Sequence, residues 1–208
     1  MARSKQYSNE TIIEAARKMF LEKGPGVSTL DIAKEAGVSE GLLFKRFGTK
    51  QKLFVTAMGI PEFDPEKMLG VRLGKGDMRE NLSKLTLELI NIFHTMFPRM
   101  IMLWSQHKNA TFEELHRHPE APPIKFLRAL EKYLSDETEK GRLAAVDPLI
   151  TARTLLGAAV HYVFWDVVGL NQHVPLEAKP YAETVVDGLW QGIKPRTRCT
   201  DKRRRRRK

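Results

Sequence analysis

The sequence predicts an all-α protein with a three-helix domain at its N-terminus and a larger helical domain after it. Apolar residues recur at the three- and four-residue spacing of amphipathic helices as far as about residue 194. Alternating strand-like runs are absent, and prolines and glycines separate the apolar segments. The chain has 208 residues, of which 42% are hydrophobic, and this is enough for a substantial buried core.

Prolines and glycines set the expected helix boundaries, because neither is common inside a helix. The breaks are placed at Pro61, Pro65, Gly74, Gly76, Pro98, Pro119, Pro122, Pro123, Gly141, Pro148 and Pro175. The apolar periodicity between them predicts helices at residues 8–24, 28–36, 39–47, 49–59, 77–96, 98–107, 122–140, 147–170 and 177–194.

The segment 28–53 carries the most specific pattern in the chain, two short helices joined by a tight turn. Ser28 or Thr29 caps the first helix, and Gly37 ends it because glycine readily adopts the left-handed conformation. Val38 fills the turn. The expected apolar side of the first helix consists of Leu30, Ile32, Ala33 and Ala36.

Ser39 is expected to cap the second helix, whose first amides can also meet a phosphate. Leu43 and Phe47 lie four residues apart and should face the core. The residues left toward solvent are Glu40, Gly41, Leu42, Phe44, Lys45 and Arg46. A third helix begins at Lys50, whose side chain is well placed to contact the DNA backbone. This layout is typical of a helix-turn-helix, whose second helix enters the major groove of duplex DNA. The alternative is three ordinary amphipathic helices with a solvated basic face.

Residues 8–58 resemble the N-terminal domain of TetR-family transcriptional regulators. The matching pieces are Ile12 to Gly24, Thr29 to Ser39 (TLDIAKEAGVS), Leu43 to Phe47 (LFKRF) and Lys50 to Leu53 (KQKL). The resemblance implies an all-helical fold with phosphate contacts from Thr29, Phe44, Arg46 and Lys50.

Two of those positions depart from the family's usual residues. Phe44 stands where a tyrosine is typical and has no hydroxyl to donate to a phosphate. Arg46 stands where a histidine is typical and supplies a permanent charge. For base readout, Glu40 can accept from a cytosine amine, Lys45 or Arg46 can reach guanine, and Leu42 can meet a thymine methyl. The expected DNA-binding set is Thr29, Ser39, Glu40, Gly41, Leu42, Phe44, Lys45, Arg46 and Lys50.

Charge divides the chain into three parts. The expected DNA-binding domain covers residues 1–55, a helical effector-binding and dimerisation domain covers 56–195, and a basic disordered tail covers 196–208. Net charge is +4 over residues 1–60, −2 over 61–195 and +8 over 196–208, which sum to +10. Positive charge at both ends suits a polyanion, and the tail can follow DNA phosphates or can serve only to solubilise the chain.

The last two helices are expected to form a homodimer. Helix 147–170 is apolar nearly all round, as in a helix covered on every side, and helix 177–194 has a broad apolar stripe. The stripe consists of Tyr181, Val185 or Val186, Leu189, Trp190 and Ile193. In the TetR family these helices usually pair with their copies in a second subunit. A two-fold symmetric DNA site also needs two DNA-binding domains. Burial within one subunit is the alternative.

Methionines and aromatic residues of the middle segment suggest an adaptable apolar pocket for a small effector. The expected ligand-binding residues are Met96, Met100, Trp104, Phe126, His161 and Trp165. A methionine-rich stretch at helical spacing is also compatible with plain core. His161 and Asp166 interrupt an apolar helix and need partners there, either a ligand or a second subunit.

The sequence predicts no enzyme, cofactor or metal site. A glycine-rich phosphate loop and a G-x-S-x-G elbow are absent. His107, His116 and His118 lie in a loop-like stretch without cysteine ligands, which favours surface histidines over a metal site. The single cysteine, Cys199, fits a reducing cytosol.

The sequence also predicts a cytoplasmic, nucleoid-associated protein without a membrane partner. The first ten residues contain no apolar stretch typical of a signal peptide. The longest apolar run, 155–170, is shorter than the roughly 20 residues that a membrane-spanning helix needs.

Together these features predict a repressor that is released from a palindromic operator in double-stranded DNA by a small apolar effector. Two other functions remain open. One is a non-specific, nucleoid-associated DNA binder that depends on the basic tail. The other is an effector-binding protein whose N-terminal domain has lost specific DNA recognition.

Overall fold

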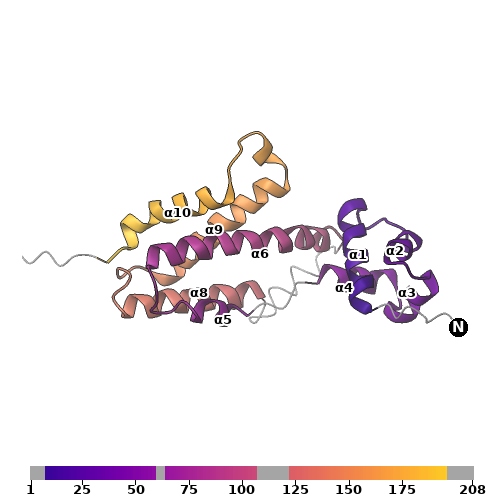
Figure 1. Cartoon of the computed structure of the whole chain (residues 1–208), viewed down its shortest axis with the longest axis horizontal. Helices are drawn as coiled ribbons and strands as arrows, with labels where there is room; N and C mark the ends of the chain where they lie inside the picture. The colour runs from indigo at the N-terminus through magenta and orange to yellow at the C-terminus, as the bar shows by residue number, and fades with distance from the viewer. Residues whose placement is uncertain (1–7, 60–63, 107–121, 196–208) are drawn as a thin grey trace, which may run out of the picture. The chain divides into compact units, whose positions relative to one another are not determined.

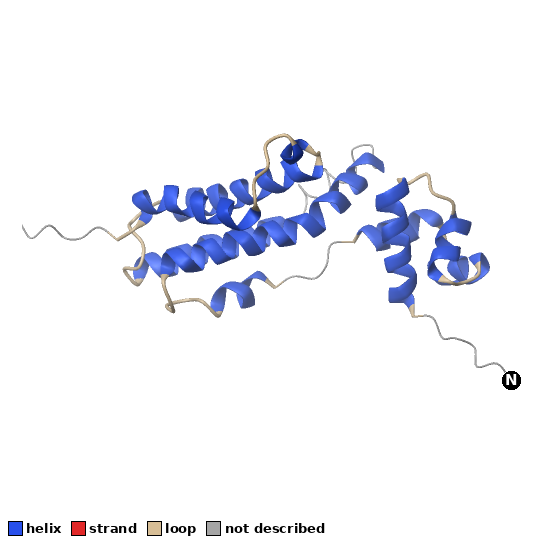
Figure 2. Cartoon of the chain, turned by 45° about the horizontal axis from the view of Figure 1, so that its top comes forward, coloured by secondary structure: helices blue, strands red, loops and turns tan. Residues whose placement is uncertain are grey.

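The computed structural model of the chain describes residues 8–59, 64–106 and 122–195. Every regular element in these ranges is helical (Figure 2). The described residues form two compact units, one from 8–59 with 92–106 and one from 64–91 with 122–195. Within these ranges no helix combines the length and hydropathy needed to cross a bilayer.

The first unit is built on four short helices, labelled in Figure 1. They are α1 (Asn9–Lys23), α2 (Thr29–Ala36), α3 (Glu40–Phe47) and α4 (Lys50–Met58). Each begins after a serine or threonine whose hydroxyl oxygen accepts an amide of the first turn, so the four N-termini are fixed by Ser8, Ser28, Ser39 and Thr49. The second half of α6 (Met78–Gln106) completes this unit.

The core of the first unit gathers apolar side chains from all four short helices. The buried set is Ile12, Ala16, Met19, Phe20, Val27, Ile32, Ala33, Ala36, Leu43, Leu53, Phe54, Ala57 and Met58. Phe20 and Phe54 meet edge to face with ring centroids 4.9 Å apart. The expectation that Leu30 joins this core is wrong, since its side chain is 49% exposed. Leu30 is the second residue of α2, two positions before the buried Ile32, and so points to another side of the helix.

Two arginines hold the C-terminal end of α4. Arg17 Nε donates to the Ala57 carbonyl at 2.8 Å, and Arg99 Nη1 donates to the Gly59 carbonyl at 3.2 Å. Arg17 also forms an ion pair with Glu14. Arg99 is buried, and desolvation followed by the nearby charge of Arg17 lowers its pKa. The terminal carbonyls of a helix lack intrahelical donors, so cations are favourable partners there.

The second unit contains α5 (Pro65–Gly70), the first half of α6, α8 (Pro122–Glu139), α9 (Pro148–Val167) and α10 (Ala178–Ile193). A 3-10 turn, η1 (Leu170–Gln172), follows α9. Its core includes Leu82, Leu85, Leu89, Ile90, Leu130, Leu134, Leu155, Ala159 and Val163. Helix α5 packs on α8 and α8 packs on α9.

A buried carboxylate fastens the turn between α5 and α6 to the end of α8. Glu137 is fully buried, and its Oε1 accepts the Gly74 amide at 2.8 Å. Arg142 Nε lies 2.7 Å from Glu137 Oε2, an ionic contact that lacks hydrogen-bond alignment. The same guanidinium donates to the carbonyls of Lys75 and Gly76 at 2.8 and 2.9 Å. A charged group at this depth is tolerated because it is paired on both sides.

Two expected boundaries differ from the structure. The break at Pro98 is wrong, because α6 is one helix with Pro98 inside it. An interior proline costs about 3 kcal/mol, but apolar side chains are packed on both sides of it. Leu89 and Ile90 are buried before it, and Met102 and Leu103 pack on the first unit's core after it.

The second difference is α5, which was not expected as a helix. Asp64 accepts from the Lys67 amide at 3.0 Å, and Pro65 occupies the first helical position. This Asp-Pro start is a recognised helix signal, but the segment is only six residues long. Its burial against α8 supplies the stability that its length does not.

The turn between α2 and α3 gives a test of stability. Gly37 has φ 68° and ψ 26°, the left-handed conformation, and its amide bonds to the carbonyls of Ala33 and Lys34. We expect Gly37→Ala to lower the free energy of unfolding by about 1 kcal/mol, the cost of this conformation for an L-residue. Urea denaturation in the absence of DNA measures the change.

Gly41→Ala is the matched control, because Gly41 lies inside α3 and a Cβ there meets no atom within 4 Å. Alanine should raise stability at this position by about 0.5 kcal/mol through helix propensity. Equal effects at the two glycines would contradict the conformational explanation.

Candidate functional site

Helix α3 presents one face to the core and the other to solvent. Leu43 is fully buried, while Phe47 and Leu42 are half-buried. Gly41, Phe44, Lys45 and Arg46 are exposed, and the Phe44 ring is 40% exposed despite its size. The solvent orientation predicted for these four residues is confirmed. An exposed phenylalanine beside two cations leaves an apolar surface within a positively charged one.

The N-terminus of α3 is arranged by Ser39. Its hydroxyl oxygen accepts the Leu42 amide at 3.2 Å, which confirms the predicted cap. The amides of Glu40 and Gly41 precede the first intrahelical hydrogen bond, so they remain donors for a partner outside the helix. Lys50 has the equivalent first position in α4, behind the Thr49 cap, and is half-buried.

Thr29 and Glu40 are brought together by their helix starts, a contact that the sequence did not reveal. Thr29 is the first residue of α2 and Glu40 the first residue of α3. The Thr29 hydroxyl donates a short hydrogen bond to Glu40 Oε1. Both side chains are half-buried, so the carboxylate is held against α2 rather than free in solvent. An eleven-residue separation at two helix starts has no local sequence signature.

Arg46 contacts the beginning of α1. Its Nη1 donates to Asn9 Oδ1 at 3.0 Å, which directs the guanidinium toward the α1 N-terminus. The pKa of the neighbouring Glu10 carboxyl is lowered, first by its backbone hydrogen bond, then by Ser8 and to a smaller extent by the charge of Arg46. One Asn9 bond uses one of five guanidinium donors, so Arg46 keeps donors for another partner.

The six residues predicted to bind an effector are divided between the two units. Met96, Met100 and Trp104 are half-buried on the second half of α6, in the first unit. In the second unit, Phe126 is buried on α8, Trp165 is half-buried on α9 and His161 is exposed. The His161 and Trp165 rings lie 5.5 Å apart. A common pocket for the set remains a prediction.

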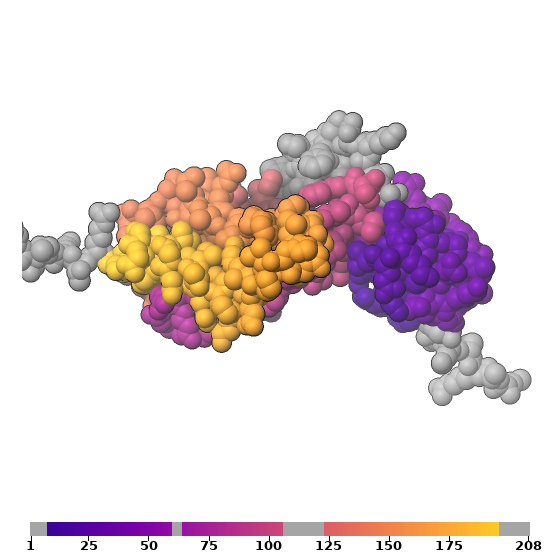
Figure 3. Space-filling model, turned by 90° about the horizontal axis from the view of Figure 1, so that it is seen from above, coloured from indigo at the N-terminus to yellow at the C-terminus, as the bar shows by residue number. Residues whose placement is uncertain are grey.

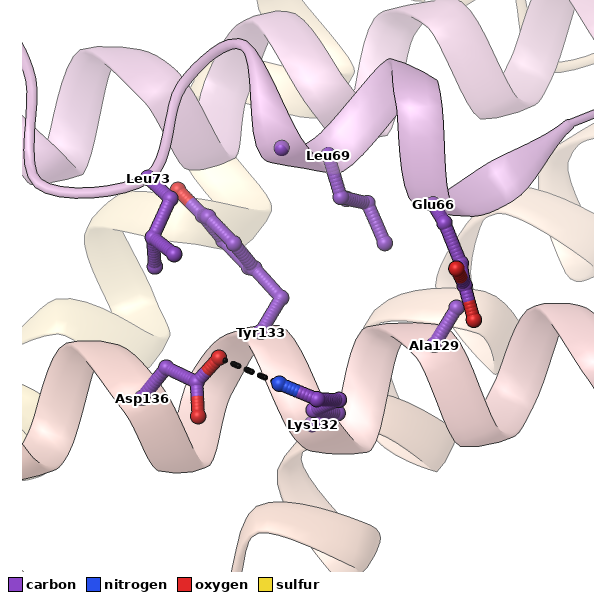
Figure 4. Close-up of a pocket in the computed structure, with 8 residues that line it drawn as sticks. Glu66, Leu69, Leu73, Ala129, Lys132, Tyr133 and Asp136 are labelled. Carbon is purple, nitrogen blue, oxygen red and sulfur yellow. Dashed lines mark hydrogen bonds and ion pairs between the residues drawn. The ribbon is translucent and has the colours of Figure 1, made fainter.

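A cavity of about 150 Å³ opens between α5 and α8 in the second unit. Figure 4 shows Glu66 and Leu69 pointing toward α8, and Tyr133 pointing back toward α5. The lining residues are Glu66, Leu69, Gly70, Leu73, Ala129, Lys132, Tyr133 and Asp136. None of the six predicted residues is among them. The signal that was missed is the four-residue spacing of Leu69 with Leu73 and of Ala129 with Tyr133.

The polar groups of this cavity are mostly paired. Lys132 Nζ donates to Asp136 Oδ2 at 2.9 Å, and Tyr133 Oη donates to Met78 Sδ at 3.7 Å. Burial, assisted by the charge of Glu137, raises the pKa of Tyr133 to about 12. The phenol therefore stays a neutral hydrogen-bond donor throughout the physiological range.

In the parts of the chain that the structure describes, no group of three or more histidine, cysteine, aspartate and glutamate side chains could hold a metal ion. The histidines His107, His116 and His118, together with Cys199 and the tail 196–208, lie outside the described residues.

Comparisons with known proteins agree with this arrangement. The sequence model of bacterial regulatory proteins of the tetR family matches residues 12–57. The model of the C-terminal domain of AefR-like transcriptional repressors matches residues 86–188. The HTH-type transcriptional repressor Rv3405c of Mycobacterium tuberculosis is 44% identical over 43 residues, 20% of this chain. This chain spans only 23% of the length of that curated relative.

Solved structures share the fold over nearly the whole chain. A TetR-family transcriptional regulator from Mesorhizobium loti has a TM-score of 0.65 and 20% identity, covering 93% of this chain and 100% of that one. A transcriptional regulator from Saccharomonospora viridis, in complex with choline, has a TM-score of 0.64 and 16% identity, covering 90% and 97%. Identities at this level show the fold alone. One sequence model matches the N-terminal part of the chain and the other matches the C-terminal part. The chain therefore belongs to the tetR family of bacterial transcriptional regulators.

Proposed function

We propose that this protein is a homodimeric repressor that binds a palindromic DNA operator through α3. The observation that carries the proposal is the exposed Phe44-Lys45-Arg46 face of a helix that is capped by Ser39 and anchored by Leu43. A helix of this kind fits the major groove, with cations at the phosphates. The names of the matched C-terminal domain and of the mycobacterial relative, both repressors, support repression over activation. This function places the protein in the cytoplasm, at the nucleoid.

Selection of binding sites from random duplex DNA tests the proposal. The full chain and a version that ends at residue 195 are compared, since residues 196–208 carry a net charge of +8. We expect both to select one palindrome, because sequence readout belongs to α3 while the tail adds a sequence-independent contribution. Absence of a selected sequence, or its loss with the tail, would favour a non-specific nucleoid-associated binder.

Lys50 is proposed to contact phosphate only. We expect Lys50→Ala to weaken binding to specific and non-specific DNA by a similar factor. The slope of log affinity against log salt should fall by about 0.9, the contribution of one phosphate. Fluorescence anisotropy over a salt series measures both quantities.

The control is Lys67→Ala, which removes the same charge from an exposed position on α5. It should leave the salt slope unchanged. An unchanged slope for Lys50→Ala would remove Lys50 from the DNA interface.

A row of exposed residues on α9 supports dimerisation. Ile150, Thr154, Gly157, His161 and Phe164 are spaced alternately by four and three residues, and all are exposed. This spacing is typical of the contact line between two packed helices. Ile150 and Phe164 are 57% and 43% exposed, which is unusual for side chains of their size. The five residues of the row carry no charge, and the exposed Arg153 lies beside them between Ile150 and Gly157. Gly157, in the middle of the row, permits close approach. His161 lies in this row, which favours its predicted role in a dimer contact over a ligand contact.

The apolar surface continues beyond α9. Val168, Leu170, Val174 and Leu176 are all more than 40% exposed in the segment that leads to α10. Figure 3 shows this segment, in orange, at the molecular surface together with α10, in yellow. Of the stripe predicted on α10, Val186 and Ile193 are buried within the subunit, while Tyr181 donates to the Ala158 carbonyl of α9. The proposed interface therefore rests more on α9 than on α10.

Substitution in the row tests the dimer. Phe164→Glu places two like charges near each other across a two-fold axis. We expect the dimer dissociation constant to rise on the order of 100-fold, since like-charge contacts cost several kcal/mol. Sedimentation over a concentration series gives the constant.

Val71→Glu is the control, because Val71 is 59% exposed and lies outside the row. It should leave the dimer intact. A Phe164→Glu variant that stays dimeric would show that another surface forms the interface.

Release by a small effector completes the proposal. Such a molecule acts only through its different affinity for DNA-competent and DNA-incompetent dimers. The candidate sites are the residues predicted from the sequence other than His161, and the cavity between α5 and α8. About 150 Å³ is a volume that holds a molecule of benzene's size in a protein interior. The choline complex of the Saccharomonospora viridis regulator is consistent with a small ligand in this fold.

A further inference from the structure

We propose that Glu40 selects a cytosine in the operator and that Thr29 is the residue that positions it. The inference rests on the proposed DNA-binding function and specifies what one side chain of α3 reads. It assigns Thr29 a role different from the phosphate contact that the family resemblance implies.

The two side chains form one unit at the adjoining starts of α2 and α3. Thr29 follows the Ser28 cap and Glu40 follows the Ser39 cap, so both backbones are held by capping bonds, at 3.1 and 3.2 Å. The Thr29 hydroxyl donates to Glu40 Oε1. Because both residues are half-buried, the bond restricts the carboxylate to few rotamers. An oriented carboxylate can discriminate between bases, whereas a mobile surface glutamate cannot.

The single hydroxyl proton of Thr29 decides between its two possible roles. A threonine hydroxyl has one proton, and here Glu40 accepts it. A DNA phosphate offers only acceptor oxygens, so it cannot receive that proton while the bond to Glu40 persists. The Thr29 hydroxyl therefore acts on DNA through Glu40.

The charge of Glu40 then determines which group it can face. Within the described parts of the chain, no lysine or arginine pairs with Glu40, so its carboxylate is not neutralised by an ion pair. An ionised carboxylate accepts hydrogen bonds and repels phosphates and other acceptors.

Major-groove chemistry limits the partner to cytosine. Guanine presents two acceptors, N7 and O6, and thymine presents the O4 acceptor with a methyl group. Adenine has an N6 donor, but its N7 acceptor lies beside it and repels a carboxylate. The cytosine N4 amine has an acceptor, O6 of the paired guanine, on one side only, whereas the adenine amine lies between its own N7 and the O4 of the paired thymine. Glu40 Oε2, the oxygen not bonded to Thr29, is the atom expected to accept from N4.

The test compares base preference at each operator position for the wild-type protein and three variants. Glu40→Gln should shift one position from cytosine toward adenine, because an amide can pair with both N6 and N7. The expected loss of cytosine preference is about tenfold, since a good base contact supplies about 1–3 kcal/mol of discrimination. Thr29→Val, which keeps the shape and removes the hydroxyl, should weaken the same preference, and Thr29→Ser should retain it.

Thr56→Val is the matched control, because the Thr56 hydroxyl donates to the Lys52 carbonyl of its own helix. It should leave every base preference unchanged. Circular dichroism and thermal unfolding of each variant separate misfolding from altered readout. A purely structural role for Thr29 would lower affinity for all sequences equally and leave the preferences as they were.

The outcomes distinguish this inference from the proposed function. If the wild-type protein selects no sequence, the DNA-binding proposal itself fails. If it selects a palindrome and Glu40→Gln changes no base preference, the cytosine assignment is overturned while the repressor proposal stands. If Glu40→Gln changes the preference and Thr29→Val does not, the positioning role of Thr29 is overturned.

Discussion

The burial of Leu43 is the constraint on which the DNA-binding surface depends. Helix α3 has eight residues, too few to be stable alone in water, and Leu43 is its one fully buried side chain. The pocket that receives it is the shared core of α1, α2 and α4, with Phe20 and Phe54 packed edge to face within it. The solvent face of α3 is free to vary chemically because this anchor does not involve it.

Polar contacts outside that core set the directions of the functional side chains. Arg46 is turned toward Asn9 of α1, and Glu40 is bonded to Thr29 of α2. Each contact joins α3 to a different helix, so both charged side chains are oriented before any partner arrives. Pre-orientation lowers the entropy lost on binding. The surface therefore combines cations suited to phosphates with a carboxylate suited to a base.

Local chemistry made part of this structure predictable. The Gly37 turn, the Ser39 cap and the solvent face of α3 follow from single residues and their spacing. Three features did not follow, because each depends on packing between distant segments. Leu30 is exposed although apolar, Pro98 lies inside a continuous helix, and α5 is held by α8. The Thr29–Glu40 bond and the cavity beside α5 belong to the same class.

The arginine contacts at the end of α4 bear on how such a protein can be cut and recombined. The Gly59 carbonyl is bonded to Arg99, and Met102 and Leu103 pack on the core formed by α1 to α4. A fragment that stopped after α4 would lose this donor and expose apolar surface normally covered by α6. The first unit, which carries the DNA-binding helix, is thus continuous in space but not in sequence. A chimaera that exchanged the DNA-binding unit between two such regulators would have to transfer the second half of α6 along with the first four helices.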